Sequence, residues 1–417
     1  MSRITGSWKR HFRPAVLNAL HRFNGIPVPR DAIAVADYAA ASPACRIIGL
    51  TNTMEDVIPP RVISGDPAHV EKTLAMIPDR EVRSRYVMEL LGAKRIRGDD
   101  FVAVIEHGRV AHDGGLVVTP ENRLLRGVSG IDFGTDLPTN PLHLRYLPNP
   151  RQISTSLAIV TCPMPYNYYH WMMEAVPRLG AYAEAGMKID RVYAPVSRKF
   201  QRGTLQLLGI PRGQVVLGTR NSHVRCERLL ASSCNTPTTR RKTIFLHNAM
   251  TSHLDGRVQP GLRVYVSRRR RGKRIITNDA EVFRSLAPLG FRRYDLETMP
   301  VADQVALFYG AECVVAPHGA GLTNIVFCRA GTKVIEVNTP YRTSTCFYDI
   351  AHHRGLAYQL HIAQPVDKGF FHFNSSTGLG DSNMAVEPGP FAALVRSFLE
   401  DASAEDHTER FRRAIAA

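Results

Sequence analysis

The feature that most constrains the fold is a regular alternation of short apolar runs and amphipathic segments, which begins near Thr155. The run "SLAIVT" precedes the helix-like "MMEAVPRLGAYAEAG", "RVYAPV" precedes "RKFQRGTLQLLGI", and "QVVLG" precedes the extended "SHVRCERLLASS". Strands that alternate with helices in this way are typical of parallel βαβ units. The pattern therefore predicts a Rossmann-like sheet over about residues 151–255.

The same alternation restarts after "DGRVQPG". Four apolar runs, "LRVYVSR", "FRRYDLE", "ECVVAP" and "TKVIEVN", are separated by "NDAEVFRSLAPLG", "PVADQVALFYGA" and "HGAGLTNIVFCRAG", which have helical spacing. We predict a second doubly wound domain over residues 256–385. Two such domains in tandem are expected to face each other across a cleft at the carboxyl ends of their strands.

The remaining parts of the chain have weaker patterns. The stretch "FVAVIEHGRVAHDGGLVVTPENRLL" alternates and is broken by turn residues, which predicts a small β-rich portion over about residues 45–150. We expect it to join residues 151–255 in one N-terminal domain, residues 31–255. Within residues 386–417, "PFAALVRSFLED" has one apolar stripe, which predicts a helix that packs across the domains.

The charge of the chain favours anionic partners. Lys and Arg number 53 against 37 Asp and Glu, a formal net charge of +16. Residues 1–30 form a basic amphipathic segment, which either lies in a membrane interface or docks on the protein's own surface. Because no run approaches the ~20 apolar residues of a span and no signal-peptide core is visible, we expect a cytoplasmic protein with possible peripheral contact at the inner face of an anionic membrane.

Several site classes lose support. The seven cysteines are widely spread without a CxxC pair, so reduced thiols are expected rather than disulfides or a zinc cluster. The sequence has no DxD triplet and no metal-ligand spacing, so we expect neither a metal nor a cofactor. GxSxG, GxxxxGK[ST] and GxGxxG are also absent, which removes the usual support for hydrolase, P-loop and dinucleotide sites.

A candidate acid/base pair lies in "YNYYHWMMEAVPRL". His170 and Glu174 are one helical turn apart and share a face. A histidine with a pKa near ~6.5 can take a proton near neutrality when an acid orients it. Three interpretations stay open: His170 is the base and Glu174 orients it, Glu174 is the base, or Asn167 and His170 brace the helix while Glu174 pairs with Arg178.

Two stretches that follow predicted strands carry groups suited to phosphate. "APHGAGLTN" contains glycines that let the backbone approach a ligand, and it begins a helix whose free N–H groups favour an anion. "VSRRRRGKRIITND" holds the densest positive charge, and arginine forks match phosphate geometry. A bare charge run is commonly a solvated face. Its position after a strand, in the same domain as HGAG, favours a phosphate site in which arginines neutralise a leaving diphosphate.

Four segments, in this order and spacing, resemble glycosyltransferase family 61: "NYYHWMMEAVPRL", "SRRRRGKRIITNDAEVF", "DQVALFYGAECVVAPHGAGLTNIVF" and "GTKVIEV". This family includes plant arabinoxylan transferases, protein O-GlcNAc transferases and many bacterial polysaccharide-biosynthesis proteins. The resemblance covers about residues 100–400. It implies a GT-B fold, an inverting mechanism, an acceptor-side N-terminal domain and a nucleotide-sugar donor, usually UDP-linked, held by the C-terminal domain.

The family's motifs map onto particular residues of this chain. Its Asn-x-x-His-x-x-x-acid pattern falls on Asn167, His170 and Glu174, which implies a catalytic role for His170 and Glu174. The implied donor-binding residues are Ser267, Arg268, Arg269, Arg274, Asn278, Asp279, His318, Gly319, Ala320, Gly321 and Asn324. Where the family commonly has Asn-Glu, this chain has Asn-Asp, a shorter acid at position 279.

The predicted function is that of an inverting, metal-independent glycosyltransferase of the EC 2.4 class. The sequence resembles the bacterial members that act in capsular polysaccharide, exopolysaccharide or lipopolysaccharide synthesis, so the expected acceptor is a glycan or glycolipid. Two alternatives remain open. One is a basic, non-catalytic protein that binds anionic membrane or nucleic acid, although the basic run lacks the interleaved aromatic residues of a nucleic-acid surface. The other is a nucleotide-sugar epimerase or hydrolase on the same fold.

Overall fold

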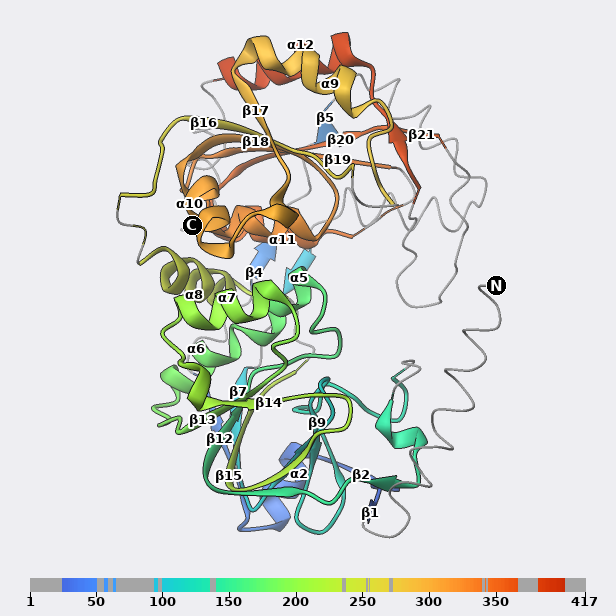
Figure 1. The fold of residues 1–417 in the computed structure, drawn as a ribbon, viewed down its shortest axis with the longest axis vertical. Coiled ribbons are helices and arrows are strands. Elements are labelled where there is room, and N and C mark those ends of the chain that lie inside the picture. Colours follow the sequence, from blue (N-terminus) through green and yellow to red (C-terminus); the bar gives the residue numbers. More distant parts are fainter. Residues whose placement is uncertain are drawn as a thin grey trace. The chain divides into compact units, whose positions relative to one another are not determined.

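The structure is a computed structural model, drawn in Figure 1. It describes residues 25–50, 56–58, 63–64, 94–96, 100–135, 140–234, 238–252, 254, 256–269, 273–339, 342, 344–366 and 382–401. The chain divides into two compact units. The first unit comprises residues 1–54 and 97–237, and the second unit comprises residues 55–96 and 238–417. Both units combine sheets and helices, which confirms a mixed α/β protein.

The first unit is built on one mixed sheet of ten strands. Its parallel part has the predicted strand–helix alternation, in the order β14 (Val215–Leu217), β13 (Arg191–Ala194), β12 (Arg151–Ile159) and β15 (His223–Ser232). The helical segments between these strands are α5 (Tyr168–His170), η2 (Trp171–Ala175), α6 (Arg178–Glu184), α7 (Lys199–Leu207) and η3 (Arg212–Gln214).

The β-rich stretch extends this same sheet rather than forming a separate portion. Strand β15 is ten residues long. The edge that does not pair with β12 pairs in antiparallel fashion with both β7 (Phe101–Glu106) and β8 (Arg109–Ala111). The remaining strands continue from these two: β9 (Leu116–Val118), β10 (Leu124–Arg126), β2 (Ala32–Ala34) and, beside β7, β3 (Cys45–Gly49). Smaller elements are α2 (Val35–Ala41), η1 (Pro141–His143) and the pair β1 (Ile26–Pro27) and β11 (Tyr146–Leu147).

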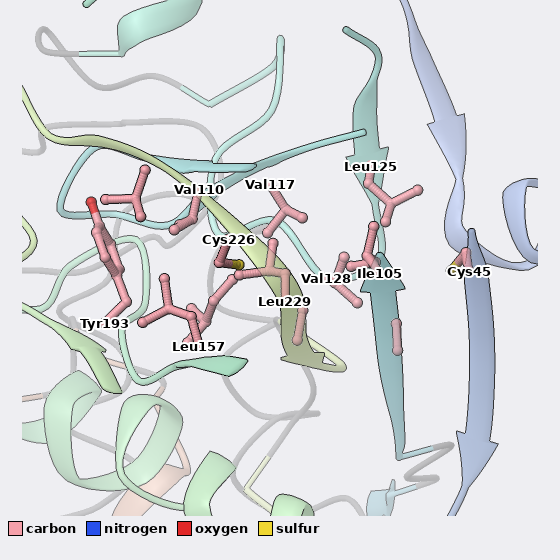
Figure 2. Close-up of a cluster of buried hydrophobic side chains, with 14 of the residues drawn as sticks. Cys45, Ile105, Val110, Val117, Leu125, Val128, Leu157, Tyr193, Cys226 and Leu229 are labelled. Atoms are coloured by element: carbon pink, nitrogen blue, oxygen red, sulfur yellow. The ribbon is translucent and has the colours of Figure 1, made fainter. Parts of the chain in front are cut away.

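A continuous apolar cluster joins the parallel and antiparallel parts of the sheet (Figure 2). It runs from Cys45 on β3, past Ile105 and Leu229, to Tyr193 on β13 (Figure 2). Burial of apolar area is the main favourable term in folding, so this shared cluster explains why the two parts form one unit. At its end, the Tyr193 hydroxyl donates to the backbone oxygen of His112 at 3.0 Å.

The second unit contains a six-stranded parallel sheet. Its order is β17 (Phe291–Tyr294), β16 (Leu262–Val266), β18 (Ala311–Pro317), β19 (Lys333–Asn338), β20 (Ala357–Ile362) and β5 (Ile63–Ser64). The chain moves from β16 outward to β17 and then returns to β18, so the direction of winding reverses between β16 and β18. In doubly wound sheets, ligands bind outside the carboxyl ends of the strands at such a reversal.

Helices cover both faces of this sheet (Figure 1). One face carries α9 (Asp279–Leu286) and α12 (Pro388–Glu400). The other carries α8 (Arg240–Thr251), α10 (Val301–Gly310), η6 (Ala320–Phe327) and α11 (Cys346–Arg354). Short elements complete the unit: η4 (Ala287–Leu289), η5 (Leu296–Thr298), β21 (Gln364–Pro365), β22 (Met384–Ala385), β4 (Asp56–Ile58) and β6 (Lys94–Ile96).

Helix α12 differs from its predicted role. We expected it to pack across the domains, but its apolar residues Phe391, Val395 and Phe398 belong to the core of the second unit. They lie in one cluster with Val282 and Leu286 of α9. The apolar stripe was identified correctly, but a stripe does not specify which surface it covers.

The boundaries of the units also differ from the predicted ranges 31–255 and 256–385. Strand β5 belongs to the second unit because Leu360 of β20 pairs with Ile63. Helix α8 belongs there because it packs on η6, with the ring Nδ1 of His247 3.0 Å from the Val326 oxygen. A two-residue edge strand has too few residues to show a period, so the sequence pattern did not indicate this exchange.

The predicted basic amphipathic segment, residues 1–30, lies largely outside the described residues, which begin at residue 25. Within the described part of the chain, no helix is both long enough and apolar enough to cross a membrane. All seven cysteines are described and have free thiols, and five of them are buried.

Candidate active site

The segment after β12 is not the regular α-helix predicted from its sequence. It begins as α5, widens into the π-helical turn η2 and continues as α6. Pro177 has no backbone N–H with which to continue an α-helical ladder, and the N–H of Val176 instead bonds to the Trp171 oxygen at 3.0 Å. Single π-helical turns are frequent at functional sites.

His170 and Glu174 meet across this widened turn. The ring Nδ1 of His170 lies 2.6 Å from Glu174 Oε1, and the two side chains are 21% and 27% exposed. The Asn167 side chain caps α5 by accepting the Tyr169 N–H at 2.9 Å. If Nδ1–H donates to the carboxylate, Nε2 is left as the proton acceptor. The pair therefore has the geometry of an oriented base.

The third interpretation, in which Asn167 and His170 brace the helix and Glu174 pairs with Arg178, agrees with the structure only in part. Asn167 does cap the helix, as the structural interpretation required. The Arg178 guanidinium, however, is buried and donates to the Ser232 oxygen at 3.4 Å. Among the ion pairs of the described residues, Glu174 pairs with His170 rather than with Arg178.

In the second unit, the two predicted phosphate-binding stretches come together at the reversal of winding. Ser267, Arg268 and Arg269 follow β16, and His318 to Gly321 follow β18. These strands are neighbours, with Tyr265 paired to Val315. The Arg268 guanidinium lies so close to Gly319 that a Cβ atom there would overlap it. Gly319 has extended backbone, so space for Arg268, not backbone strain, accounts for the glycine.

The buried carboxylate of Asp279 contacts two residues of the arginine stretch, Ser267 and Arg269. Its buried Oδ1 accepts hydrogen bonds from the hydroxyls of Ser267 and Tyr265, both at 3.0 Å. Its Oδ2 lies 3.4 Å from Arg293 Nη1 and 3.7 Å from Arg269 Nε. Burial and the Asp279 charge raise the pKa of Tyr265, so that hydroxyl stays a donor at neutral pH. Asp279 thus acts as a positioning residue for Ser267 and Arg269.

His318 is held by a buried carboxylate. Its ring Nδ1 bonds to Glu336 of β19, and each side chain is 1% exposed. The other Glu336 oxygen accepts the Tyr358 hydroxyl at 2.5 Å. Burial lowers the pKa of His318 to about 4, although Glu336 raises it, and the charges of Arg342 and Arg274 lower it further. The ring is therefore neutral at pH 7 and donates Nδ1–H to Glu336.

Two predicted binding residues brace the unit instead of presenting their amides. The Asn278 side chain makes a two-point contact with the backbone of Val386, donating to its oxygen at 2.7 Å and accepting its N–H at 3.2 Å. Asn324 is fully buried, and its amide donates to Gln304 Oε1 at 2.9 Å and to the Gly321 oxygen at 3.0 Å.

The other predicted residues, Arg274, Ala320 and Gly321, belong to the same two stretches. Arg274 has a φ of 53°, in the left-handed region that non-glycine residues seldom adopt. Its charge contributes to lowering the pKa of His318. Ala320 begins η6, a 3₁₀ helix where an α-helix was expected. A Cβ at Gly321 would come within 3.1 Å of Leu296 Cδ1, so this glycine serves close packing.

Sequence reasoning missed Arg293, Tyr265 and Glu336. Glu336 had a visible signal, because it is the one acidic residue in the apolar run "KVIEV". Arg293 lies near the carboxyl end of β17, beside the other arginines in space but distant in sequence. Across the described ranges, no group of three or more His, Cys, Asp or Glu side chains has an arrangement that could hold a metal ion.

Comparisons with known proteins point to one protein family. Residues 168–335 match the family model described as Glycosyltransferase 61. The EGF domain-specific O-linked N-acetylglucosamine transferase of Drosophila melanogaster is 28% identical over 163 residues, which is 36% of this chain and 29% of that relative. The chain thus spans less than a third of that relative's length.

One solved structure is also similar, at a low level. It is the dodecameric iron-containing heptosyltransferase TibC in complex with ADP-D-β-D-heptose. The match covers 57% of this chain and 77% of that chain, with 11% identity and a TM-score of 0.28. This superposition is too loose to assign a fold. The family match is the stronger finding, because its range contains α5, the arginine stretch and the HGAG turn.

Proposed function

Residues 168–335 form a glycosyltransferase family 61 domain, and from this we propose that the protein is an inverting glycosyltransferase of the EC 2.4 class. In the proposed reaction, a sugar passes from a UDP-linked donor to a hydroxyl of a polysaccharide or glycolipid acceptor in cell-surface glycan synthesis. The proposed fold is GT-B, with the second unit as donor-binding domain and the first unit as acceptor domain.

The observation that carries this proposal is the contact of Arg268 with Gly319 at the reversal of winding. It brings a guanidinium fork to the edge of the sheet where doubly wound domains bind nucleotides. Arg269 is 59% exposed and is tied to the buried Asp279, so its charge is available on the same stretch. Two-point arginine contacts suit a diphosphate.

His170 is the proposed catalytic base. Its Nε2 takes the proton of the acceptor hydroxyl as the hydroxyl oxygen forms a bond to the anomeric carbon. The bond from that carbon to the donor phosphate breaks on the opposite side, and nucleoside diphosphate leaves. A single displacement of this kind inverts the anomeric configuration. The 2.6 Å contact between His170 Nδ1 and Glu174 supports this assignment, because it orients the ring.

In this proposal the arginines stabilise the leaving diphosphate. Charge develops on the phosphate oxygens as the sugar departs, and fixed positive groups stabilise that charge most when they are already in position. Asp279 holds Arg269 and Ser267, and the Arg268 position is set by the space at Gly319. We therefore propose a metal-independent transfer, for which the expected result is activity that survives an excess of EDTA.

We also propose that the enzyme works at the cytoplasmic face of an anionic membrane. The formal charge of +16 supports this, since basic surfaces are drawn to anionic lipid head groups. Cosedimentation with vesicles tests it. Binding is expected to vesicles that contain phosphatidylglycerol and to weaken steeply with salt, and equal binding to neutral vesicles would contradict it.

Ligand-dependent thermal unfolding tests the donor assignment. A ligand at about 100 times its Kd stabilises the native state by roughly 2.7 kcal/mol, so UDP is expected to raise the Tm by several degrees. Arg269→Ala should remove most of that rise. Arg212→Ala is the matched control, because Arg212 is an exposed arginine at the start of η3 in the first unit. The proposal fails if no nucleoside diphosphate or nucleotide sugar changes the Tm.

A further inference from the structure

A polar pocket lies in the first unit at the carboxyl ends of three neighbouring parallel strands. It has a volume of about 370 Å³ and is lined by Tyr166, Ser197, Arg198, Thr219, Arg220 and Asn221. Tyr166 follows β12, the Ser197–Arg198 pair follows β13, and the other three residues follow β14. The pocket therefore forms at the edge of a parallel sheet where ligands commonly bind.

Two arginines give the pocket its charge. The Arg198 guanidinium carbon lies 5.7 Å from the centroid of the Tyr166 ring. Among the described residues, no carboxylate lies within 4.0 Å of Arg198. Arg220 is 48% exposed, and its Nε lies 4.0 Å from Oδ2 of Asp113, at the limit of an ion pair.

Asp113 offsets only one of these two positive charges, so a net positive charge remains at the pocket. The carboxylate is 3% exposed; its Oδ1 lies 2.9 Å from His112 Nδ1, and its Oδ2 accepts the Tyr166 hydroxyl. Burial raises the pKa of Asp113, but His112, Tyr166 and Arg220 outweigh burial and lower it. One buried negative charge thus lies behind Tyr166, while two positive charges line the pocket.

The walls of the pocket are held in place from the inside. The Tyr193 hydroxyl donates to the backbone oxygen of His112 at 3.0 Å, and the Thr161 hydroxyl donates to the backbone oxygen of Asp113. On the other side, Gln201 of α7 donates to the Pro165 oxygen at 2.8 Å. Pre-positioned groups bind a ligand at a lower entropic cost than mobile groups.

The same segment connects the pocket to the proposed catalytic base. Tyr166 is four residues before His170, and the two residues flank the Asn167 cap of α5. The rings of Tyr168 and Phe200 meet edge to face at 5.4 Å, which fastens this segment to α7, the helix that directly follows Arg198. A group bound in the pocket would therefore contact the segment that also carries the proposed base, His170.

We propose that this pocket binds a carboxylate or phosphate group of the acceptor, so that the acceptor is an acidic saccharide. This inference rests on the proposed glycosyltransferase function. Arg198 and Arg220 supply forked donors for the anion, and Ser197 and Asn221 offer polar groups for sugar hydroxyls. The volume of about 370 Å³ falls in the range of roughly 300 to 1,000 Å³ typical of small-molecule sites.

Titration of the full chain with small saccharides, without donor, tests this inference. The probes are D-glucuronate, glucose 6-phosphate and neutral D-glucose, with binding followed by ligand-observed NMR or calorimetry. We expect the charged sugars to bind at least about tenfold more tightly than glucose, and to lose this advantage as salt screens the arginines. The tighter of the two acids identifies the anion as carboxylate or phosphate. Equal affinity for all three sugars would overturn the inference.

Single substitutions assign the binding to this pocket. Arg198→Ala and Arg220→Ala are each expected to raise the Kd of the preferred acid by about tenfold, a typical effect of losing one charged contact. Both side chains are exposed, so the fold should tolerate their loss, which circular dichroism checks. Arg212→Ala removes the same charge elsewhere in the unit and should leave the Kd unchanged. An equal effect of all three substitutions, or of none, would overturn the assignment.

The outcomes separate this inference from the proposed function. If UDP raises the Tm while the acids bind no better than glucose, the acidic acceptor is wrong and the glycosyltransferase proposal stands. If the acids bind through Arg198 and Arg220 but no nucleotide binds, the pocket is an anion site and the glycosyltransferase proposal is wrong.

Discussion

The guanidinium group of Arg268 occupies the space that a side chain at Gly319 would need. The two residues are 51 positions apart in the sequence (319 − 268), yet they meet because β16 and β18 are neighbours in the sheet. This contact links the arginine stretch to the HGAG turn. It also explains why residue 319 is a glycine. The backbone there is extended, a conformation that any residue can adopt, so the reason is the space that the Arg268 guanidinium occupies.

Gly319→Ala should therefore act through Arg268. The added methyl group displaces the guanidinium, so we expect at least about a tenfold rise in the Kd for UDP, with little change in the fold. Arg268→Ala should have a similar effect, and the double variant should be no worse than either single variant, because the two changes remove one interaction. Calorimetric titration measures all three. Additive effects would show that Gly319 and Arg268 act separately.

The His170–Glu174 pair predicts an ordered loss of activity. His170→Asn should lower kcat by about 10²- to 10⁴-fold, the usual contribution of a positioned base, and leave UDP binding unchanged. Glu174→Gln keeps the shape of the side chain and should cause a smaller loss. Steady-state kinetics with a saturating donor distinguishes the two roles. A larger loss for Glu174→Gln than for His170→Asn would make Glu174 the base.

The buried contact of His318 with Glu336 should contribute far more to stability than an exposed ion pair. Glu336→Ala removes the acceptor of the His318 Nδ1–H and of the Tyr358 hydroxyl, and each buried donor that loses its acceptor costs about 1–3 kcal/mol. Glu312→Ala is the control, because Glu312 pairs with Arg263 at the surface, where pairs contribute roughly 0–1 kcal/mol. Chemical denaturation compares them. Similar losses for both would contradict this account of Glu336.

Stability should fall as the pH is lowered, and His223 should contribute to the fall. Burial lowers the pKa of His223 to about 4 from 6.5, although its contact with the Pro148 oxygen raises it. Between these values the unfolded chain binds a proton that the native state does not, so the free energy of unfolding decreases from pH 6.5 toward pH 4.

His223→Gln should reduce this slope. The variant lacks the group that takes up a proton on unfolding, and one proton corresponds to about 1.4 kcal/mol per pH unit. Unfolding free energies measured at several pH values below neutrality give the slope for each protein. An unchanged slope in the variant would show that His223 is protonated equally in both states.

Much of the second unit could be predicted from sequence because each element carries its own period. The runs that became β16 to β19, and the helical segments between them, have clear strand or helix spacing. The β-rich stretch was expected to share a domain with the parallel strands, but the sequence did not indicate their union in one sheet. That union depends on β15, whose two edges pair in opposite senses, and a single sequence does not show which edge a strand uses.

For the site residues, the sequence indicated the chemical groups but not the position of every side chain. The pairing of His170 with Glu174 followed from helical spacing, although part of that helix, shortly before Pro177, is a π-helical turn. Asn278 was expected to face a ligand, but it holds Val386, more than a hundred residues away. Such long-range contacts leave no local pattern. The sequence did not predict the pocket around Arg198 and Arg220. Its lining segments follow three different strands, so they are not neighbours in the sequence.

Donor turnover, with the anomeric configuration of the released sugar read by proton NMR, tests the central claim most directly. A panel of nucleotide sugars is incubated with the protein in water, with and without acidic oligosaccharides. We expect one donor to release nucleoside diphosphate together with a sugar of inverted configuration, faster with an acceptor, and His170→Asn to slow the release by at least about 10²-fold. Release of no nucleotide from any donor, or a product that retains the donor's configuration, would contradict the account.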